Sequence, residues 1–302
     1  MSAEIIDGRK VAEKLKAEVA AEVGRLAADG IGCALATVTV GDDYSSRAYV
    51  RRLARVAAEF GVPCRPAWLP AASTLEDVLA TVRRLNDDPS VSGVLILRPL
   101  PKHICEAVVF RALAPVKDIE AVHPENAGLL ALGTPRYVPS TAASAFHVLD
   151  QWLDNAGEER SAFYHRSLIV VVGRSDNVGK PAISLAYDRQ AAVESVDEWA
   201  SRNGRLGWHT RRADVLIVAA GVAGLIRAEH IRAGAVVLDV GINPVHDPLT
   251  GTVHLAGDVS FADVAARARA ITPVPGGIGP VTDVWLIRNT TKAARNAAGE
   301  LP

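Results

Sequence analysis

The chain has 302 residues, which is enough for one large or two medium domains with a sizeable core. Hydrophobic residues make up 49% and charged residues 22%, a composition typical of globular proteins and not of disordered ones. The formal net charge is -1, with acidic and basic residues interspersed. Nothing in this balance indicates a partner that is a nucleic acid or a membrane.

The cysteines and the N-terminus indicate the compartment. Cys33, Cys64 and Cys105 are widely spaced and form neither a CxxC motif nor a paired histidine motif, so we expect no disulfide framework and no metal site. The start MSAEIIDGRK lacks an apolar run behind a basic segment, and the longest apolar runs are too short to cross a bilayer. A cytoplasmic protein is therefore expected.

The first part of the chain alternates helix and strand patterns. Helices are predicted over 8–29, 44–60 and 74–87, and strands over 34–40, 64–69 and 91–97. Asp42 or Asp43 is a suitable N-cap for the second of these helices. Because strands alternate with helices of this length, we expect a parallel sheet with right-handed crossovers.

A second pattern begins near residue 139. A helix is predicted over about 141–154, followed by a polar connection and then by apolar strands at 167–173, 192–196, 214–221 and 235–243. Strands that are apolar throughout are typical of a parallel sheet covered on both faces. The stretch ITPVPGGIGPVT at 271–282 is predicted to form a rigid loop before a final helix over about 281–298.

The stretch VVVGRSDNVG indicates a nucleotide-binding turn. Gly173 directly follows a predicted buried strand, and Gly179 lies just inside the next helix. The spacing is GxxxxxG and not GxGxxG, so the order of strand, turn and helix carries more weight than the pattern. A pyrophosphate could approach main-chain N–H groups there, helped by the helix dipole. The alternative is an ordinary strand-to-helix turn that contains glycines.

Two charged positions bear on the choice between NAD and NADP. The strand after the turn ends at Asp197 and Glu198, and a carboxylate there can accept hydrogen bonds from ribose hydroxyls and would repel a 2′-phosphate. Arg174 acts in the opposite direction, because a guanidinium group suits a phosphate. The sequence therefore favours NAD over NADP. The alternative is that Asp197 and Glu198 are solvated loop residues with no role in cofactor binding.

Several longer motifs occur in a fixed order over nearly the whole chain. They are YVRRLARVAAEFG at 49–61, GVLILRPLP at 93–101, KDIEAVHPEN at 117–126, PST at 139–141, VVVGRSDNVGKP at 170–181, ADVLIVAAG at 213–221, DVGIN at 239–243 and ITPVPGGIGP at 271–280. Together they resemble the bifunctional methylenetetrahydrofolate dehydrogenase/cyclohydrolase (FolD) family.

The resemblance implies an α/β fold in two domains with a cleft between them. Residues 1–140, completed by the C-terminal helix 281–302, would form the catalytic and substrate domain, and 141–280 a Rossmann-like parallel-sheet domain that binds NAD or NADP. It also implies a homodimer. In this family a hydride passes from the methylene bridge of the folate to the nicotinamide, and water then opens the resulting methenyl ring.

The resemblance also assigns residues. Tyr49 corresponds to the tyrosine that packs against the aromatic amide portion of the folate, and Ile242 to a main-chain contact near the nicotinamide. The remaining cofactor positions are Gly173, Arg174, Ser175, Val178, Gly179, Asp197 and Gly221. Pro275, Gly276 and Gly277 correspond to the loop that shapes the substrate site. Tyr49 could instead be ordinary helix packing, and the PVPGG run a rigid turn.

The departures from the family pattern lie in the folate half. Leu53 stands where the family has its catalytic lysine, and Leu97 where a glutamine supports that lysine. Glu120 replaces the aspartate that binds the pterin edge, Ala121 replaces the following glycine, and PSTA at 139–142 stands where the family has PCTP. Arg55 keeps a positive charge two residues past the missing lysine, so Tyr49, Arg55 and Glu120 are the catalytic residues that we expect.

These departures affect the two reactions differently. Hydration of a methenyl cation needs a group that positions and deprotonates water, and loss of such help costs about 10²–10⁴-fold. Hydride transfer depends mainly on the proximity and orientation of two rings. The expectation is therefore a FolD-like dehydrogenase with weak or lost cyclohydrolase activity. A FolD-fold enzyme that acts on a non-folate metabolite and a catalytically silent nucleotide-binding dimer are the alternatives.

Overall fold

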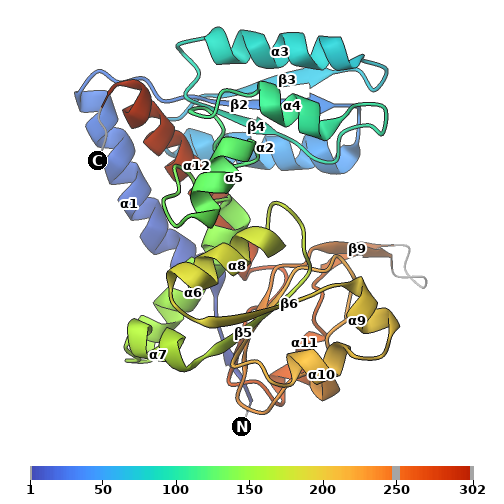
Figure 1. Ribbon diagram of the computed structural model, residues 1–302. Coiled ribbons are helices and arrows are strands. Elements are labelled where there is room, and N and C mark those ends of the chain that lie inside the picture. The colour runs from blue at the N-terminus through green and yellow to red at the C-terminus, as the bar shows by residue number, and fades with distance from the viewer. Residues whose placement is uncertain (1, 247–251, 300–302) are drawn as a thin grey trace. The chain divides into compact units, whose positions relative to one another are not determined.

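The structure is a computed structural model in which residues 2–246 and 252–299 are described (Figure 1). It divides into two compact units. The first contains the residues up to Glu13 and Thr141–Thr282, and the second contains Lys14–Ser140 and the residues from Asp283 onward. The chain passes between the units within α1 (Gly8–Ala28), α6 (Ser140–Asn155) and α12 (Ile278–Ala297).

The second unit is built on a three-stranded parallel sheet. Its strands β2 (Leu35–Val40), β3 (Cys64–Leu69) and β4 (Gly93–Ile96) lie in the order β3-β2-β4. Helix α3 (Leu75–Asp87) covers one face and α2 (Tyr44–Glu59) the other, while α4 (Glu106–Ala112) lies on the α3 side and α5 (Pro124–Ala131) follows it in the chain (Figure 1). The predicted parallel sheet is confirmed.

Side-chain alternation along these strands decides which residues face α2. Ala36, Val38, Val94 and Ile96 pack into the core beneath α3 and α4. Because successive side chains on a strand point to opposite faces, Thr37 and Leu95 face α2. Helix α2 begins where the sequence predicts it, since the Asp43 carboxylate accepts a hydrogen bond from the Ser46 N–H over 2.8 Å and so caps the helix.

The first unit contains a six-stranded parallel sheet. Its order is β1-β11-β8-β7-β5-β6, formed by β1 (Glu4–Ile5), β5 (Leu168–Val172), β6 (Ala192–Val196), β7 (Val215–Val218), β8 (Val236–Asp239) and β11 (Ala270–Ile271). The order reverses direction beside β5, and nucleotides bind at the carboxyl ends of strands at such a switch point. Residues up to Glu13 group with this unit because β1 pairs with β11.

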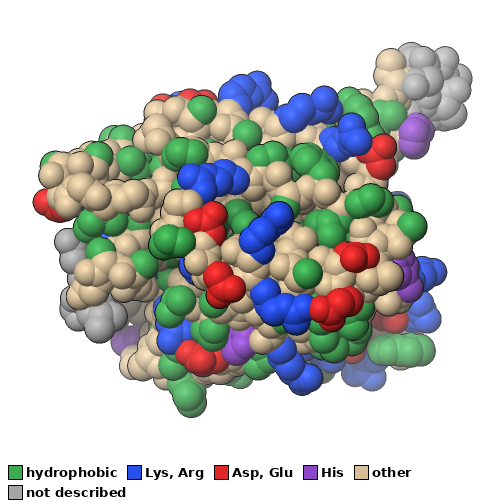
Figure 2. Space-filling model, turned by 90° about the horizontal axis from the view of Figure 1, so that it is seen from above, with side chains coloured by type: hydrophobic (Ala, Val, Ile, Leu, Met, Phe, Trp, Pro, Cys, Tyr) green, Lys and Arg blue, Asp and Glu red, His purple; other side chains and the backbone are tan. Residues whose placement is uncertain are grey.

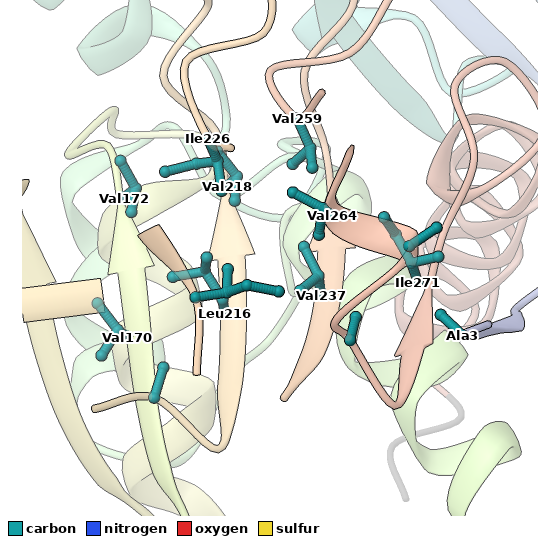
Figure 3. Packing of buried hydrophobic residues seen from close by; sticks show 14 of the residues in the cluster. Ala3, Val170, Val172, Leu216, Val218, Ile226, Val237, Val259, Val264 and Ile271 are labelled. Atoms are coloured by element: carbon teal, nitrogen blue, oxygen red, sulfur yellow. The ribbon is translucent and has the colours of Figure 1, made fainter. Parts of the chain in front are cut away.

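Apolar side chains from neighbouring strands form the core of the first unit. Val170 and Val172 of β5, Leu216 and Val218 of β7 and Val237 of β8 all belong to one buried cluster (Figure 3). Strands that are apolar throughout are expected where a parallel sheet is covered on both faces. The remaining elements of the unit are α7 (Arg160–Arg166), α8 (Gly179–Asp188), α9 (Glu198–Arg202), α10 (Leu206–Thr210), η1 (Ala228–His230), β9 (Asn243–His246), β10 (Val253–Ala256) and α11 (Phe261–Ala265).

Three predicted boundaries were wrong. Helix α12 begins at Ile278, inside the predicted loop 271–282, because a proline at position 280 is tolerated in the first turn of a helix. Strand β8 ends at Asp239 and the chain turns into the hairpin of β9 and β10, so no strand continues through 235–243. The polar connection before β5 contains α7, which the Glu159 carboxylate caps.

The surface carries both signs of charge. On the face shown in Figure 2, acidic and basic side chains alternate with hydrophobic ones. Among residues 2–246 and 252–299, no helix is long and apolar enough to cross a membrane. Cys33, Cys64 and Cys105 are free thiols.

Candidate functional site

The turn between β5 and α8 is built on two close main-chain contacts. Gly173 has φ of +113°, and a Cβ there would lie 2.1 Å from the carbonyl oxygen of Ala219. A Cβ at Gly179 would lie 2.2 Å from the carbonyl oxygen of Gly173. Both positions therefore require glycine, which permits the close approach of main-chain segments within this strand-to-helix turn.

Ser175 fixes the start of α8 against this turn. Its Oγ accepts a hydrogen bond from the Gly179 N–H over 3.3 Å, and its carbonyl oxygen accepts one from the Lys180 N–H over 3.0 Å. Val178 occupies the N-cap position and its side chain makes no capping hydrogen bond. The positive end of the α8 dipole therefore meets the glycine turn, and this arrangement fits the pyrophosphate of a dinucleotide.

Arg174 and Asp197 are held together at the end of the neighbouring strand. Nη1 of Arg174 donates to Oδ2 of Asp197 over 2.8 Å, while its Nε donates to Oγ of Ser195 over 3.0 Å. The other oxygen of Asp197 accepts the Trp199 N–H over 3.1 Å and so caps α9. Glu198 instead pairs with Arg202 on the exposed side of α9. The structure thus brings Arg174 and Asp197 together and leaves Glu198 apart.

A buried carboxylate that the sequence analysis did not identify organises the next loops. Asp258 accepts hydrogen bonds from the N–H groups of Ala220, Gly221 and Val222 over 2.6, 2.9 and 2.9 Å. Its Oδ1 also accepts a hydrogen bond from the side-chain amide of Asn243 over 2.8 Å. One side chain therefore ties the loop after β7 to the segment after β8, where Ile242 is 54% exposed.

A second buried aspartate supports Asp258. Asp239 accepts the N–H groups of Gly241, Asp258 and Val259, each over 3.0 Å. Burial raises the pKa of Asp239 to about 7, which these hydrogen bonds oppose. Two short motifs in the sequence contain these aspartates. Asp239 in DVGIN ends strand β8, Asp258 in GDVS follows strand β10, and each motif contains a glycine. DVGIN was recognised as a motif from the sequence, whereas GDVS was not.

The PVPGG loop packs against the start of α1 within the first unit. Gly276 has φ of +110°, and its carbonyl oxygen accepts the Gly8 N–H over 3.0 Å. A Cβ at Gly8 would lie 1.7 Å from the carbonyl oxygen of Gly277. Pro275 precedes these glycines after a cis peptide bond. Glycine at these positions permits the contact between the loop and α1.

In the second unit, Tyr49 and Leu53 lie one turn apart on α2. Leu53 is wholly buried and Tyr49 is half-buried. Burial raises the pKa of the Tyr49 hydroxyl, the carboxylates of Asp283 and Glu120 raise it further, and the Arg52 cation opposes them. Leu97 is also buried, with its N–H bound to the carbonyl of Val38. The two positions at which the resemblance implies a lysine and a glutamine are therefore apolar and inside the core.

Arg55 lies away from Tyr49. It is exposed, and six residues along a helix place it about 120° around the axis from Tyr49. The cation that does accompany Tyr49 is Arg52, whose guanidinium carbon lies 5.2 Å from the centre of the tyrosine ring. Nη2 of Arg52 donates to Oδ1 of Asp283 on α12 over 3.1 Å. Neither Arg52 nor Asp283 was identified from the sequence, because the pair forms across 231 residues.

Glu120 is half-buried beside the start of α6. Its Oε1 accepts the Ser140 N–H over 2.9 Å, and Ser140 is the first residue of that helix. Burial raises the pKa of Glu120 to about 7, against the effect of its bonds to Ser140. The next residue, Ala121, has φ of +52°, a conformation that favours glycine. Asp118 holds this turn by accepting the N–H groups of Val122 and His123.

Comparison with known proteins agrees with this geometry. Residues 6–120 match the domain described as "Tetrahydrofolate dehydrogenase/cyclohydrolase, catalytic domain", and residues 141–298 match "Tetrahydrofolate dehydrogenase/cyclohydrolase, NAD(P)-binding domain". The chain is 58% identical over 301 residues to "Bifunctional protein FolD 3" of Rubrobacter xylanophilus, covering 99% of this chain and 95% of that one.

Two solved structures are similar over almost their whole length. A bifunctional FolD enzyme from Campylobacter jejuni is 33% identical with a TM-score of 0.87, covering 98% of this chain and 99% of that one. The FolD enzyme of Trypanosoma brucei, solved with NADP cofactor and inhibitor, is 34% identical with a TM-score of 0.89 and covers 99% of both chains. The chain therefore belongs to the tetrahydrofolate dehydrogenase/cyclohydrolase family.

Proposed function

We propose that the protein is an NAD(P)-dependent dehydrogenase that oxidises the methylene bridge of 5,10-methylenetetrahydrofolate, and that its cyclohydrolase step is slow or lost. Membership of the family supports the substrate class. The single observation that carries the second part is Leu53, which is wholly buried one turn from Tyr49. An apolar side chain there can neither deprotonate nor orient water.

Oxidation of the methylene bridge requires no acid or base from the unit that contains Leu53 and Leu97. The bound nicotinamide accepts the hydride, so the protein's task is to hold two rings in register. The glycine turn at Gly173 and Gly179 suits the pyrophosphate, and Asp258 presets the loops that contain Gly221 and Ile242. On the folate side Tyr49 supplies a ring face, and Glu120 supplies a carboxylate for the amino-pyrimidinone edge.

NAD is the cofactor that we favour. The Asp197 carboxylate lies at the end of β6, where it can accept hydrogen bonds from the ribose hydroxyls and repel a 2′-phosphate. Arg174, the residue that would attract such a phosphate, already donates to Asp197 and Ser195. The trypanosomal relative was solved with NADP, so the preference has to come from these side chains and not from the family.

Two further expectations belong to this proposal. We expect a homodimer, because the family resemblance implies one, and we propose a cytoplasmic location. The proposed hydride transfer depends on neither expectation, because it uses residues of one chain.

The proposal is tested with purified protein, methylenetetrahydrofolate and each nucleotide in turn. Formation of the reduced cofactor and of the methenyl product is followed by absorbance, and hydrolysis of added methenyl compound is followed separately. We expect turnover with NAD above that with NADP, and slow hydrolysis. Folded protein that reduces neither nucleotide would reject the folate dehydrogenase assignment.

A further inference from the structure

An ion pair beside Tyr49 links α2 to α12 within the second unit. Arg52 donates to Oδ1 of Asp283 over 3.1 Å while its guanidinium carbon lies 5.2 Å from the centre of the Tyr49 ring. Asp283 is 6% exposed, whereas 43% of the Arg52 side chain is exposed. The Asp283 carboxylate is therefore buried, whereas part of the Arg52 side chain is in contact with solvent.

Arg52 and Asp283 each have one polar atom that forms no hydrogen bond within the described residues. Nε of Arg52 is buried and has no hydrogen-bond acceptor among residues 2–246 and 252–299. Within the same ranges, the Asp283 carboxylate accepts a hydrogen bond from Arg52 at Oδ1, and Oδ2 accepts none from the protein, although Oδ2 is not among the fully buried unpartnered atoms. A buried polar atom without a partner, such as Nε of Arg52, is rare and marks a place where water or a ligand can bind.

The location of these two atoms matters because of Leu53. Arg52 directly precedes the position at which the family has its lysine, and Leu53 itself is wholly buried. The only polar groups from α2 and α12 that interact with Tyr49 are Arg52 and Asp283, as far as the structure describes those helices. Nε of Arg52 can donate a hydrogen bond to a water molecule at this place, and the Asp283 carboxylate can accept one from water.

We propose that Asp283 is the general base that activates water for opening of the methenyl ring, and that Arg52 is its positioning residue. This inference rests on the proposed function, since it takes the methenyl compound as the substrate of the second step. It identifies the group through which hydrolysis runs in a chain that has leucine in place of the lysine.

The step balances as follows. Oδ2 of Asp283 takes a proton from water as the water oxygen bonds to the carbon of the amidinium cation, which gives a neutral hydroxyl adduct. The bond from this carbon to one ring nitrogen then breaks, that nitrogen receives the proton from Asp283, and the hydroxyl proton leaves to solvent. The product carries a formyl group on the other nitrogen, and one proton is released overall.

The surroundings of Asp283 suit a base. Burial raises its pKa and the Arg52 cation opposes that effect, so Asp283 is a stronger base than an exposed aspartate. The other titratable group that interacts with it is Tyr49 of α2, on which Glu120 also acts. Removal of the Arg52 charge should raise the pKa of Asp283 further and move the acid limb of the hydrolysis profile to higher pH.

The experiment compares Asp283→Asn with the wild-type chain in two assays, hydrolysis of added methenyl compound and oxidation of methylenetetrahydrofolate. Glu22→Gln is the matched control, because Glu22 forms a half-buried ion pair with Arg295 between α1 and α12 over 3.2 Å. We expect hydrolysis to fall about 10²-fold in Asp283→Asn, with oxidation changed less than about threefold, and both rates preserved in Glu22→Gln.

Arg52 is tested by its pH profile. In Arg52→Gln the acid limb of hydrolysis should move to higher pH, and in Arg52→Lys it should return toward the wild-type position. Thermal unfolding of every variant shows whether it is folded. Equal losses of both activities in Asp283→Asn, unchanged hydrolysis, or no hydrolysis in the wild-type chain would each overturn the inference. The dehydrogenase assignment fails only if oxidation is absent from the wild-type chain, so the two failures are distinguishable.

Discussion

The guanidinium of Arg174 donates a hydrogen bond to the Asp197 carboxylate over 2.8 Å, so a phosphate-binding side chain and a phosphate-repelling one neutralise each other. Under the proposed preference for NAD, Asp197 would disfavour NADP in two ways, by its own charge and by holding Arg174. Removal of this carboxylate should release the guanidinium toward a 2′-phosphate.

We predict that Asp197→Asn shifts the ratio of kcat/KM for NADP over NAD by about tenfold or more toward NADP, since one charged contact is worth about 1.4 kcal/mol or more. Steady-state kinetics with both nucleotides measures the ratio. Glu198→Gln is the matched control, because that neighbouring carboxylate pairs with Arg202 instead. An unchanged ratio in Asp197→Asn would show that the pair does not set the preference.

Asp258 should act on cofactor binding through the loop that it holds. An asparagine has one acceptor oxygen in place of two, so at least one N–H group among Ala220, Gly221 and Val222 would face an amide donor. We expect Asp258→Asn to lower stability by about 1–3 kcal/mol and to raise the Kd for the nucleotide.

Calorimetry of nucleotide binding measures this effect. Asp263→Asn serves as the control, because Asp263 accepts a single N–H, that of Ala228, in the same unit. If both variants bind the nucleotide equally well, Asp258 is a purely structural residue.

The raised pKa of Glu120 makes the free energy of unfolding depend on pH. Its pKa in the folded chain, about 7, lies above the ordinary value of 4.5. The folded state therefore binds the proton more tightly, and the stability from this group is complete below about pH 4.5 and lost as the pH rises through about 7. Glu120→Gln removes the penalty of a buried charge, and glutamine can still accept the Ser140 N–H.

The variant should be more stable than wild type near pH 8, by up to about 3 kcal/mol, and the difference should disappear near pH 5. Urea unfolding at the two pH values measures it. A difference of the same size at both would mean that the charge on Glu120 is not its cause.

Ala121 carries backbone strain that glycine would relieve. Its φ of +52° lies in the left-handed region, where a side chain costs roughly 1 kcal/mol or more. Ala121→Gly should therefore stabilise the protein by about 1 kcal/mol, partly offset by the greater entropy of glycine in the unfolded chain. Denaturant unfolding checks it, and a clear loss of stability would contradict the strain.

The sequence predicted the elements that have strong local signals. The apolar strands of both sheets, the Asp43 cap and the glycine turn at Gly173 follow from periodicity and from the residues that turns require. Short elements such as α7 and the hairpin of β9 and β10 were missed. Elements of four to seven residues contain too little hydrophobic periodicity to distinguish them from a loop.

The candidate site was predictable only where a motif marks it. Tyr49 and Glu120 stand in motifs, and the structure shows both half-buried, with partial burial raising the pKa of each. Arg52 and Asp283 meet only because α12 packs in the same unit as α2, and no local pattern contains that information. Arg55 was chosen for its charge, yet helical geometry places it on another face from Tyr49.

The central claim is that oxidation survives while ring opening is slow. The most direct measurement is a single progress curve with methylenetetrahydrofolate and NAD, in which methenyl and formyl products are quantified over time. Our account predicts that the methenyl compound accumulates above its uncatalysed steady level and then decays slowly. Formation of the formyl product in step with NAD reduction, without accumulation of the methenyl compound, would contradict it.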